Sequence, residues 1–275
     1  MHMLPTNHFK RALQEGRAQI GVWSTIPSPY VSELIAGAGY DWVLLDTEHT
    51  PTDVPLMLSQ LQATAAAQPA QGRLPTHPVV RPAWNDPVLI KRYLDIGAQT
   101  ILLPFVQNVH EAQAAVKATR YPGAGIRGMG GSTRAANFGR TADYVARAAE
   151  ELCVLVQVET AEALDQIEAI AAIDGIDGIF IGPADLSASL GYPGKANHPE
   201  VSKTIDNAIR RIRACGKAPG ILMVDEPRAR ECLELGAQFI AVALDTVMLR
   251  NGLDGAAMRF RGAAQSAGTP ATSSY

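Results

Sequence analysis

Residues 153–182, CVLVQVETAEALDQIEAIAAIDGIDGIFIG, decide the fold, because they hold two short apolar runs separated by a stretch with helical periodicity. The runs, at 153–159 and 178–182, are almost continuously apolar, as strands of a parallel sheet are when both faces are buried. Between them a polar turn leads into an amphipathic segment, which predicts a helix. The stretch therefore predicts a strand, a helix and a second, parallel strand.

The same unit recurs along the chain. Candidate strands lie at 20–23, 42–46, 79–81, 100–104, 153–159, 178–182, 219–223 and 239–243. Helix signals fit the gaps: Asn85 is a candidate N-cap, Pro87 would lie in the first turn of that helix, and Gly97 would end it. Eight such units with right-handed crossovers favour a closed (β/α)8 barrel of the α/β class. An open doubly wound sheet uses the same elements, and periodicity does not separate the two.

Two segments depart from the repeat. Residues 121–140, YPGAGIRGMGGSTRAANFGR, hold six glycines and are long for a barrel connection, so we expect an ordered excursion over a site. Residues 265–275 are small, polar and without pattern, and we expect a disordered tail after a single barrel domain at 1–264.

Composition excludes several classes of protein. The chain has 275 residues, of which 47% are hydrophobic and 19% charged, and no run approaches the roughly 18 apolar residues of a membrane span. Its 24 Lys and Arg residues against 27 Asp and Glu residues, without a basic run, disfavour nucleic acid as a partner. Three cysteines without CxxC spacing and an N-terminus without an apolar signal core predict a reduced, cytoplasmic protein.

Polar residues end several of the apolar runs, and in a barrel these ends surround the active site. They are Asp46, Thr47, Glu48 and His49 after the second run, Arg81 after the third, Gln157 and Glu159 in the fifth, 182–185 (GPAD) after the sixth, and Asp245 after the eighth. Each one alone is better explained as a helix cap or an ion pair. Acids, an imidazole and a guanidinium together at one end predict a catalytic site.

Two of these acids form a candidate metal site. Glu159 and Asp185 end neighbouring strands, and two carboxylates with open water positions suit Mg²⁺ or Mn²⁺. No Cys and His cluster favours structural zinc. No lysine ends a candidate strand, which argues against a Schiff-base mechanism. The chain has no glycine-rich phosphate cradle after its last two strands and no GxGxxG after the first, so we expect an unphosphorylated substrate and no nicotinamide.

Seven segments resemble, in order and spacing, the HpcH/HpaI family of metal-dependent 2-oxoacid aldolases, over about residues 9–260. They are GYDWVLLDTEH (39–49), HPVVRP (77–82), LIKRYLDIGAQTILLPFV (89–106), RYPGAGIRG (120–128), LVQVET (155–160), GIDGIFIGPADLSASLGYPG (175–194) and FIAVALDT (239–246). The resemblance implies a TIM barrel of the phosphoenolpyruvate/pyruvate type, whose last helix is exchanged with a neighbour in a homohexamer. The helix-forming stretch 246–264 agrees with a covering partner, because it holds many apolar residues.

The resemblance also implies roles for the residues at the metal. Glu159 and Asp185 would bind Mg²⁺ or Mn²⁺, with Co²⁺ left open. His49 would be the catalytic base, Asp46 would hold a metal-bound water, and Asp95 would orient His49.

Further implied roles concern the substrate. Arg81 would contact the keto oxygen and Gln157 the substrate, while the backbone amides of Ala184 and Asp185 would receive its carboxylate. Trp23 and Leu222 would shape the remaining pocket. Many members have Gly where this chain has Thr47, which we expect to alter the shape of the pocket and not the chemistry.

The implied reaction is class II cleavage of a 4-hydroxy-2-oxoacid into pyruvate and an aldehyde. The first choice of substrate is 4-hydroxy-2-oxoheptanedioate from aromatic catabolism, which would yield succinate semialdehyde. A 2-keto-3-deoxy sugar acid derived from glucarate or rhamnonate, and decarboxylation of oxaloacetate, are the alternatives. An inactive barrel kept for assembly is disfavoured because the whole set of site residues is present.

Overall fold

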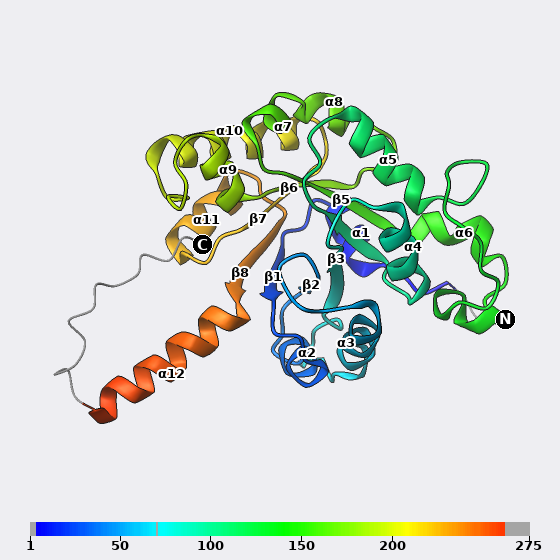
Figure 1. Ribbon diagram of the computed structural model, residues 1–275, viewed down its shortest axis with the longest axis horizontal. Helices are drawn as coiled ribbons and strands as arrows, with labels where there is room; N and C mark the ends of the chain where they lie inside the picture. The colour runs from blue at the N-terminus through cyan, green and yellow to red at the C-terminus, as the bar shows by residue number, and fades with distance from the viewer. Residues whose placement is uncertain (1–3, 70, 262–275) are drawn as a thin grey trace.

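A computed structural model describes residues 4–69 and 71–261 and shows a closed barrel of eight parallel strands in sequence order (Figure 1). The strands are β1 (Gln19–Ser24), β2 (Trp42–Asp46), β3 (His77–Arg81), β4 (Thr100–Leu103), β5 (Cys153–Val158), β6 (Gly178–Ile181), β7 (Ala218–Leu222) and β8 (Phe239–Leu244). The predicted (β/α)8 barrel is confirmed, and pairing of β1 with β8 excludes the open sheet. All eight strands lie where the apolar runs predict them, with ends that differ by no more than two residues.

Helices surround the barrel (Figure 1). They are α1 (His8–Gln14), α2 (Pro29–Ala36), α3 (Val54–Ala66), α4 (Pro87–Asp95), α5 (Val109–Thr119), the 3-10 helix η1 (Arg134–Gly139), α6 (Tyr144–Glu151), α7 (Ala161–Asp165), α8 (Ile167–Ala171), α9 (Pro183–Ser189), α10 (Pro199–Ala214), α11 (Glu226–Glu234) and α12 (Asp245–Arg261). At α4 the expected N-cap is wrong by one residue: Asp86 caps the helix, and the Asn85 side chain donates to the carbonyl of Glu111. Gly97 adopts φ 101° just beyond the helix, as predicted.

Burial on both faces explains the continuous apolar runs. Every residue of β2, β4, β5 and β6 is buried. Large rings fill the barrel interior, where Phe239 packs against both Trp42 and Phe180. Phe9 of α1 packs on Trp42 and Phe239, so the N-terminal helix closes the end of the barrel away from the carboxyl ends of the strands.

The glycine-rich excursion at 121–140 is ordered, but it does not lie where we expected. Arg134 of η1 donates to the carbonyl of Ile96, and Arg127 donates to Asp95. Both contacts are at the C-terminal end of α4, a helix that runs antiparallel to the strands. These contacts therefore place the excursion at the amino-terminal end of the barrel, opposite the site that it was expected to cover.

The last helix is an exception to the compact arrangement. Figure 1 shows α12 projecting away from the barrel. The buried residue of this helix is Asp245, with which it begins. The remainder exposes large apolar side chains: Met248, Leu249, Leu253, Met258 and Phe260. The expected boundary at 264 and the tail at 265–275 lie outside the described residues. Among the helices that are described, none has the length and apolar character needed to cross a membrane.

Candidate active site

The carboxyl ends of the strands surround a cavity of about 640 Å³. Nine of the ten residues predicted for the site line it: Trp23, Asp46, His49, Arg81, Gln157, Glu159, Ala184, Asp185 and Leu222. Thr246, Val247 and Arg250 from the start of α12 complete one wall. The barrel thus brings together strand ends that are up to about 200 residues apart in the sequence.

Arg81 lies at the base of this cavity, held by two acids. Its Nε and Nη2 each donate to one oxygen of Asp46 at 2.8 Å, and Nη1 lies 2.6 Å from Oε2 of Glu48. Asp46 pairs with Arg81 in the register of β2 and β3, which fixes the approach, and the Trp23 ring lies 4.6 Å from the guanidinium carbon. Burial lowers the pKa of Arg81, but the hydrogen bonds to Asp46 and the nearby charges of Asp46, Glu48 and Glu159 raise it overall. The guanidinium is charged and rigidly oriented.

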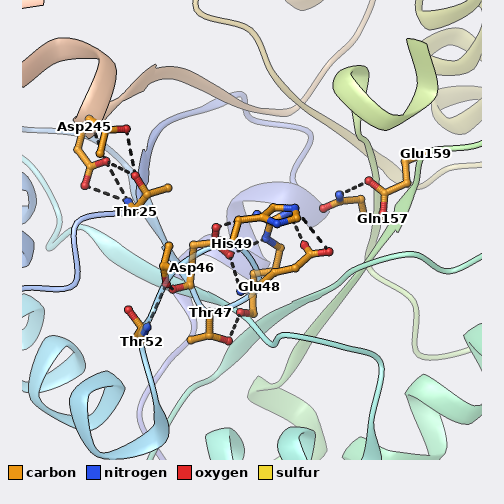
Figure 2. Close-up of polar contacts among 12 residues, drawn as sticks. Thr25, Asp46, Thr47, Glu48, His49, Thr52, Gln157, Glu159 and Asp245 are labelled. Atoms are coloured by element: carbon orange, nitrogen blue, oxygen red, sulfur yellow. Dashed lines mark hydrogen bonds and ion pairs between the residues drawn. The ribbon is translucent and has the colours of Figure 1, made fainter. Parts of the chain in front are cut away.

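Glu48 is a site residue to which the sequence assigned no role, although it lies in the same short motif as Asp46 and His49. Burial raises its pKa to about 7; the Arg81 charge opposes this shift, and the carboxylates of Asp46 and Asp185 add to it. Its Oε1 lies 3.8 Å from Nε2 of His49, whose side chain is 66% exposed (Figure 2). Glu48 therefore links the buried arginine to the accessible imidazole.

Glu159 is held from two sides. Its Oε1 accepts the backbone N–H of Phe105 at 2.9 Å. Its Oε2 accepts from Nε2 of Gln157 at 2.5 Å (Figure 2). Burial raises its pKa to about 7; the hydrogen bond from Gln157 opposes the shift, and the charges of Asp185 and Glu48 reinforce it. Among the described residues, Oε1 of Gln157 has no hydrogen-bond partner, although it is buried. It remains available to a ligand in the cavity.

The turn after β6 places two free amides beside this carboxylate. Helix α9 begins at Pro183, and its first backbone hydrogen bond runs from Leu186 to the carbonyl of Gly182 at 3.0 Å. The N–H groups of Ala184 and Asp185 precede that bond and have no backbone partner in the described residues. A Cβ on Gly182 would lie 2.5 Å from Oε2 of Glu159, so this position keeps the space beside the carboxylate open.

The electrostatic balance of the cavity fits a cation. Four carboxylates, those of Asp46, Glu48, Glu159 and Asp185, lie in or beside a cavity lined by two guanidinium groups, those of Arg81 and Arg250. In the part of the chain that the structure describes, no three His, Cys, Asp or Glu side chains form a ready metal cluster. Two carboxylates with open positions leave room for water or substrate oxygens, which is how Mg²⁺ is usually held. The residues present therefore fit a hard divalent ion bound through Glu159 and Asp185.

Asp95 is the predicted site residue that the structure places elsewhere. It ends α4, at the amino-terminal end of the barrel, and accepts from Nη2 of the buried Arg127 at 2.7 Å. In residues 4–69 and 71–261 no hydrogen bond or ion pair joins it to His49. The family resemblance, from which the role of Asp95 came, does not show that the nine-residue helix α4 carries this residue to the other end of the barrel.

Asp245 illustrates the structural role of a strand-end acid. It accepts from the Ser24 hydroxyl and from the backbone N–H groups of Thr25 and Ile26, each at 2.9 Å, so it fastens the end of β1 to the end of β8 (Figure 2). With the Thr25 hydroxyl and the Thr246 N–H, five donors satisfy this buried carboxylate and leave it no free position toward the cavity. Asp245 closes the barrel and leaves the chemistry to the other acids.

Comparison with known proteins agrees with this geometry. The family model for HpcH/HpaI aldolase/citrate lyase matches residues 19–252. A 4-hydroxy-2-oxo-heptane-1,7-dioate aldolase of Klebsiella pneumoniae is 54% identical over 255 residues, which cover 92% of this chain and 94% of that protein. The resemblance noted in the sequence is therefore confirmed.

Solved structures give the same result for the fold. An HpcH/HpaI aldolase/citrate lyase family protein from Burkholderia cenocepacia is 39% identical with a TM-score of 0.88, and the match covers 94% of this chain and all of that one. The citrate synthase SbnG is 27% identical with a TM-score of 0.80, covering 91% of this chain and 96% of that one.

Proposed function

The chain belongs to the HpcH/HpaI aldolase/citrate lyase family, and on that premise we propose that it cleaves 4-hydroxy-2-oxoheptanedioate to pyruvate and succinate semialdehyde with a divalent metal ion. It is an aldolase, a lyase of carbon–carbon bonds. The observation that carries the proposal is that a preoriented, charged Arg81 and the carboxylates of Glu159 and Asp185 line the same cavity. An enolate needs positive charge nearby, which Arg81 supplies and a divalent ion held by the two carboxylates would add.

Glu159 and Asp185 would hold Mg²⁺ or Mn²⁺, with Co²⁺ also open. A bound ion of this kind supplies a Lewis acid for the ketone and carboxylate oxygens of a 2-oxoacid. Asp46 already accepts from two nitrogens of Arg81 and from the backbone of Glu48, so its main effect is to orient the guanidinium. Its Oδ2 retains one lone pair, with which it would also hold a water molecule in the cavity.

The reacting bond is the one between C3 and C4. His49 takes the proton from the C4 hydroxyl group as the C3–C4 electron pair moves toward C2, and the aldehyde leaves. Arg81 donates to the oxygen on C2, where negative charge develops, and protonation of C3 then completes pyruvate. Exposure of the His49 ring at the mouth of the cavity allows it to exchange protons with solvent.

Two groups would fix the 2-oxoacid end of the substrate. The free amides of Ala184 and Asp185 point from the start of α9 and would receive the C1 carboxylate. The unpartnered Oε1 of Gln157 would accept from a hydroxyl group or a bound water molecule. Trp23 and Leu222 supply apolar walls to the same cavity.

The far carboxylate of a seven-carbon dioate needs a cation of its own. Arg250 of α12 lines the cavity, is exposed and contacts the side-chain oxygen of Asn251 at 3.2 Å, with no carboxylate partner in the described chain. Arg81 is assigned to the oxygen on C2, at the other end of the substrate. Arg250 is therefore the group that we assign to the distal carboxylate.

We also propose an oligomeric state and a cellular location for the protein. The exposed apolar side chains of α12 favour a second copy of the chain as cover, and exchange of this helix within a hexamer is the arrangement that the family resemblance implies. All three cysteines are free thiols, which supports the reducing environment of the cytoplasm.

The test is a comparison of kcat/KM on three metal-supplemented substrates: 4-hydroxy-2-oxoheptanedioate, a 2-keto-3-deoxy sugar acid, and oxaloacetate. The dioate should be preferred, and Arg250→Gln should lower its kcat/KM about tenfold, mainly through KM, because a charged hydrogen bond is lost. Oxaloacetate has no carboxylate beyond C4 and should be unaffected. Arg261→Gln, at the other end of α12, is the matched control. Preference for a sugar acid, unchanged by Arg250→Gln, would overturn the substrate assignment.

A further inference from the structure

Phe105, just after β4, has an unusual backbone conformation. Its φ is +52°, in the left-handed region that residues with a Cβ rarely adopt. Such a conformation carries strain and persists only where neighbouring contacts enforce it. In this protein the strained residue lies next to Glu159, a candidate metal ligand.

Contacts with the end of β5 enforce this conformation. The Phe105 N–H donates to Oε1 of Glu159 at 2.9 Å, and the next N–H, that of Val106, donates to the carbonyl of Gln157 at 3.0 Å. One residue further, the Gln107 side chain accepts from the hydroxyl of Thr160. Three successive residues of one loop thus contact residues 157–160, at the end of β5, where the candidate metal ligand lies.

Side-chain burial does not account for the conformation. The Phe105 residue is 37% exposed, and its ring lies against Trp84, itself 53% exposed, with 5.5 Å between ring centroids. Val106, in contrast, is fully buried and anchors the loop. The positive φ of Phe105 therefore affects the backbone, because it directs the N–H of this residue at the Glu159 carboxylate.

We infer that Phe105 is a positioning residue for metal binding, acting through its left-handed backbone and the N–H that it presents to Oε1 of Glu159. The inference rests on the proposed role of Glu159 as a ligand. With Gln157 fixing Oε2, the Phe105 amide fixes the other oxygen, so the carboxylate cannot rotate and its remaining lone pairs face the cavity. The identity of the ring would matter little, whereas the ability to adopt positive φ would matter greatly.

The experiment compares side chains that differ in this ability. Phe105→Asn and Phe105→Val both remove the ring and are similar in size, but asparagine tolerates the left-handed region and a β-branched residue does not. Direct titration of the metal-free protein with Mn²⁺ should give a Kd near that of the parent for Phe105→Asn. Phe105→Val should bind about 10 to 100 times more weakly, the range expected when a partner of a metal ligand is lost. Phe105→Gly should behave like the asparagine variant, and Trp84→Ala should leave the Kd unchanged.

Thermal unfolding of the metal-free variants separates positioning from simple destabilisation. If Phe105→Val does not fold, the comparison of Phe105→Ala with Phe105→Gly replaces it, because alanine also disfavours positive φ. Equal Mn²⁺ affinity for the asparagine and valine variants, or for this second pair, would overturn the inference. If Glu159→Gln bound Mn²⁺ as tightly as the parent, the ligand assignment itself would be wrong, which is a distinguishable result.

Discussion

Gly182→Ala is the perturbation whose effect follows most directly from the geometry. The added Cβ would lie 2.5 Å from Oε2 and 2.9 Å from Cβ of Glu159. The first distance is about 0.9 Å inside the ordinary contact limit of 3.4 Å, so the whole Glu159 side chain must move. Gly182 itself has φ −92°, which alanine adopts freely, and the effect is therefore steric and not a backbone penalty.

The expected magnitude has two parts. Overpacking a buried position costs about 1 to 3 kcal/mol of folding stability. Displacing Glu159, which we propose as a metal ligand, should weaken Mn²⁺ binding about 10 to 100 times, which corresponds to about 1.4 to 2.8 kcal/mol. Gly131→Ala is the matched control, because its Cβ would meet nothing within 4 Å.

Calorimetric titration of the metal-free protein with Mn²⁺, together with thermal unfolding, measures both parts. If Gly182→Ala bound Mn²⁺ as tightly as the parent and the control, Gly182 would not be needed to keep the metal site intact. A stability loss without an affinity loss would show that Glu159 moves aside but is not a ligand.

Four further predictions concern charge, pH and assembly. Arg81→Lys keeps the charge but loses the planar fork held by Asp46, so kcat should fall by about 100-fold or more in a steady-state assay; parent-like turnover would mean that charge alone suffices. Glu159 has its pKa raised from 4.5 to about 7, so Mn²⁺ binding should release about one proton at pH 6 and almost none at pH 9, measured by titration in buffers of different ionisation enthalpy. Because the raised pKa favours the protonated carboxyl group of Glu159 in the folded state, this group stabilises the fold below about pH 4.5, and the contribution is lost as the pH rises through about 7. The metal-free protein should therefore have a lower Tm at pH 8 than at pH 5.5. The opposite order would contradict the raised pKa. Light scattering should find no active species at the monomer mass of 29.3 kDa, because α12 exposes its apolar side chains there; an active monomer would refute helix exchange.

The fold was predictable because the barrel buries its strands on both faces. Runs such as 153–158 are apolar at every position except Gln157, and this pattern survives in the sequence without any knowledge of contacts. Strand ends were equally visible, so the acids, Arg81 and His49 could be placed at one end of the barrel. What periodicity could not show is where a loop goes, and the excursion at 121–140 lies at the opposite end because its arginines pair with the end of α4.

The finer structure of the site depends on contacts between distant residues. The role of Asp95 came from the family resemblance, which does not show at which end of the barrel α4 ends, whereas Glu48 received no role because one strand end offered four polar residues and no means of ranking them. Phe105 is a phenylalanine in an apolar run, and nothing in the sequence marks its positive φ. A glycine at that position would have been a visible signal.

The proposed mechanism depends on one requirement: a metal ion held by Glu159 and Asp185. Its most direct test is release of pyruvate from 4-hydroxy-2-oxoheptanedioate by protein stripped with a chelator, before and after addition of Mg²⁺ or Mn²⁺. Activity should vanish on stripping and return with the metal in the parent, but not in Glu159→Gln or Asp185→Asn at the same metal concentration. Full turnover by the stripped protein in excess chelator, or a covalent adduct trapped by borohydride in the presence of pyruvate, would contradict the account.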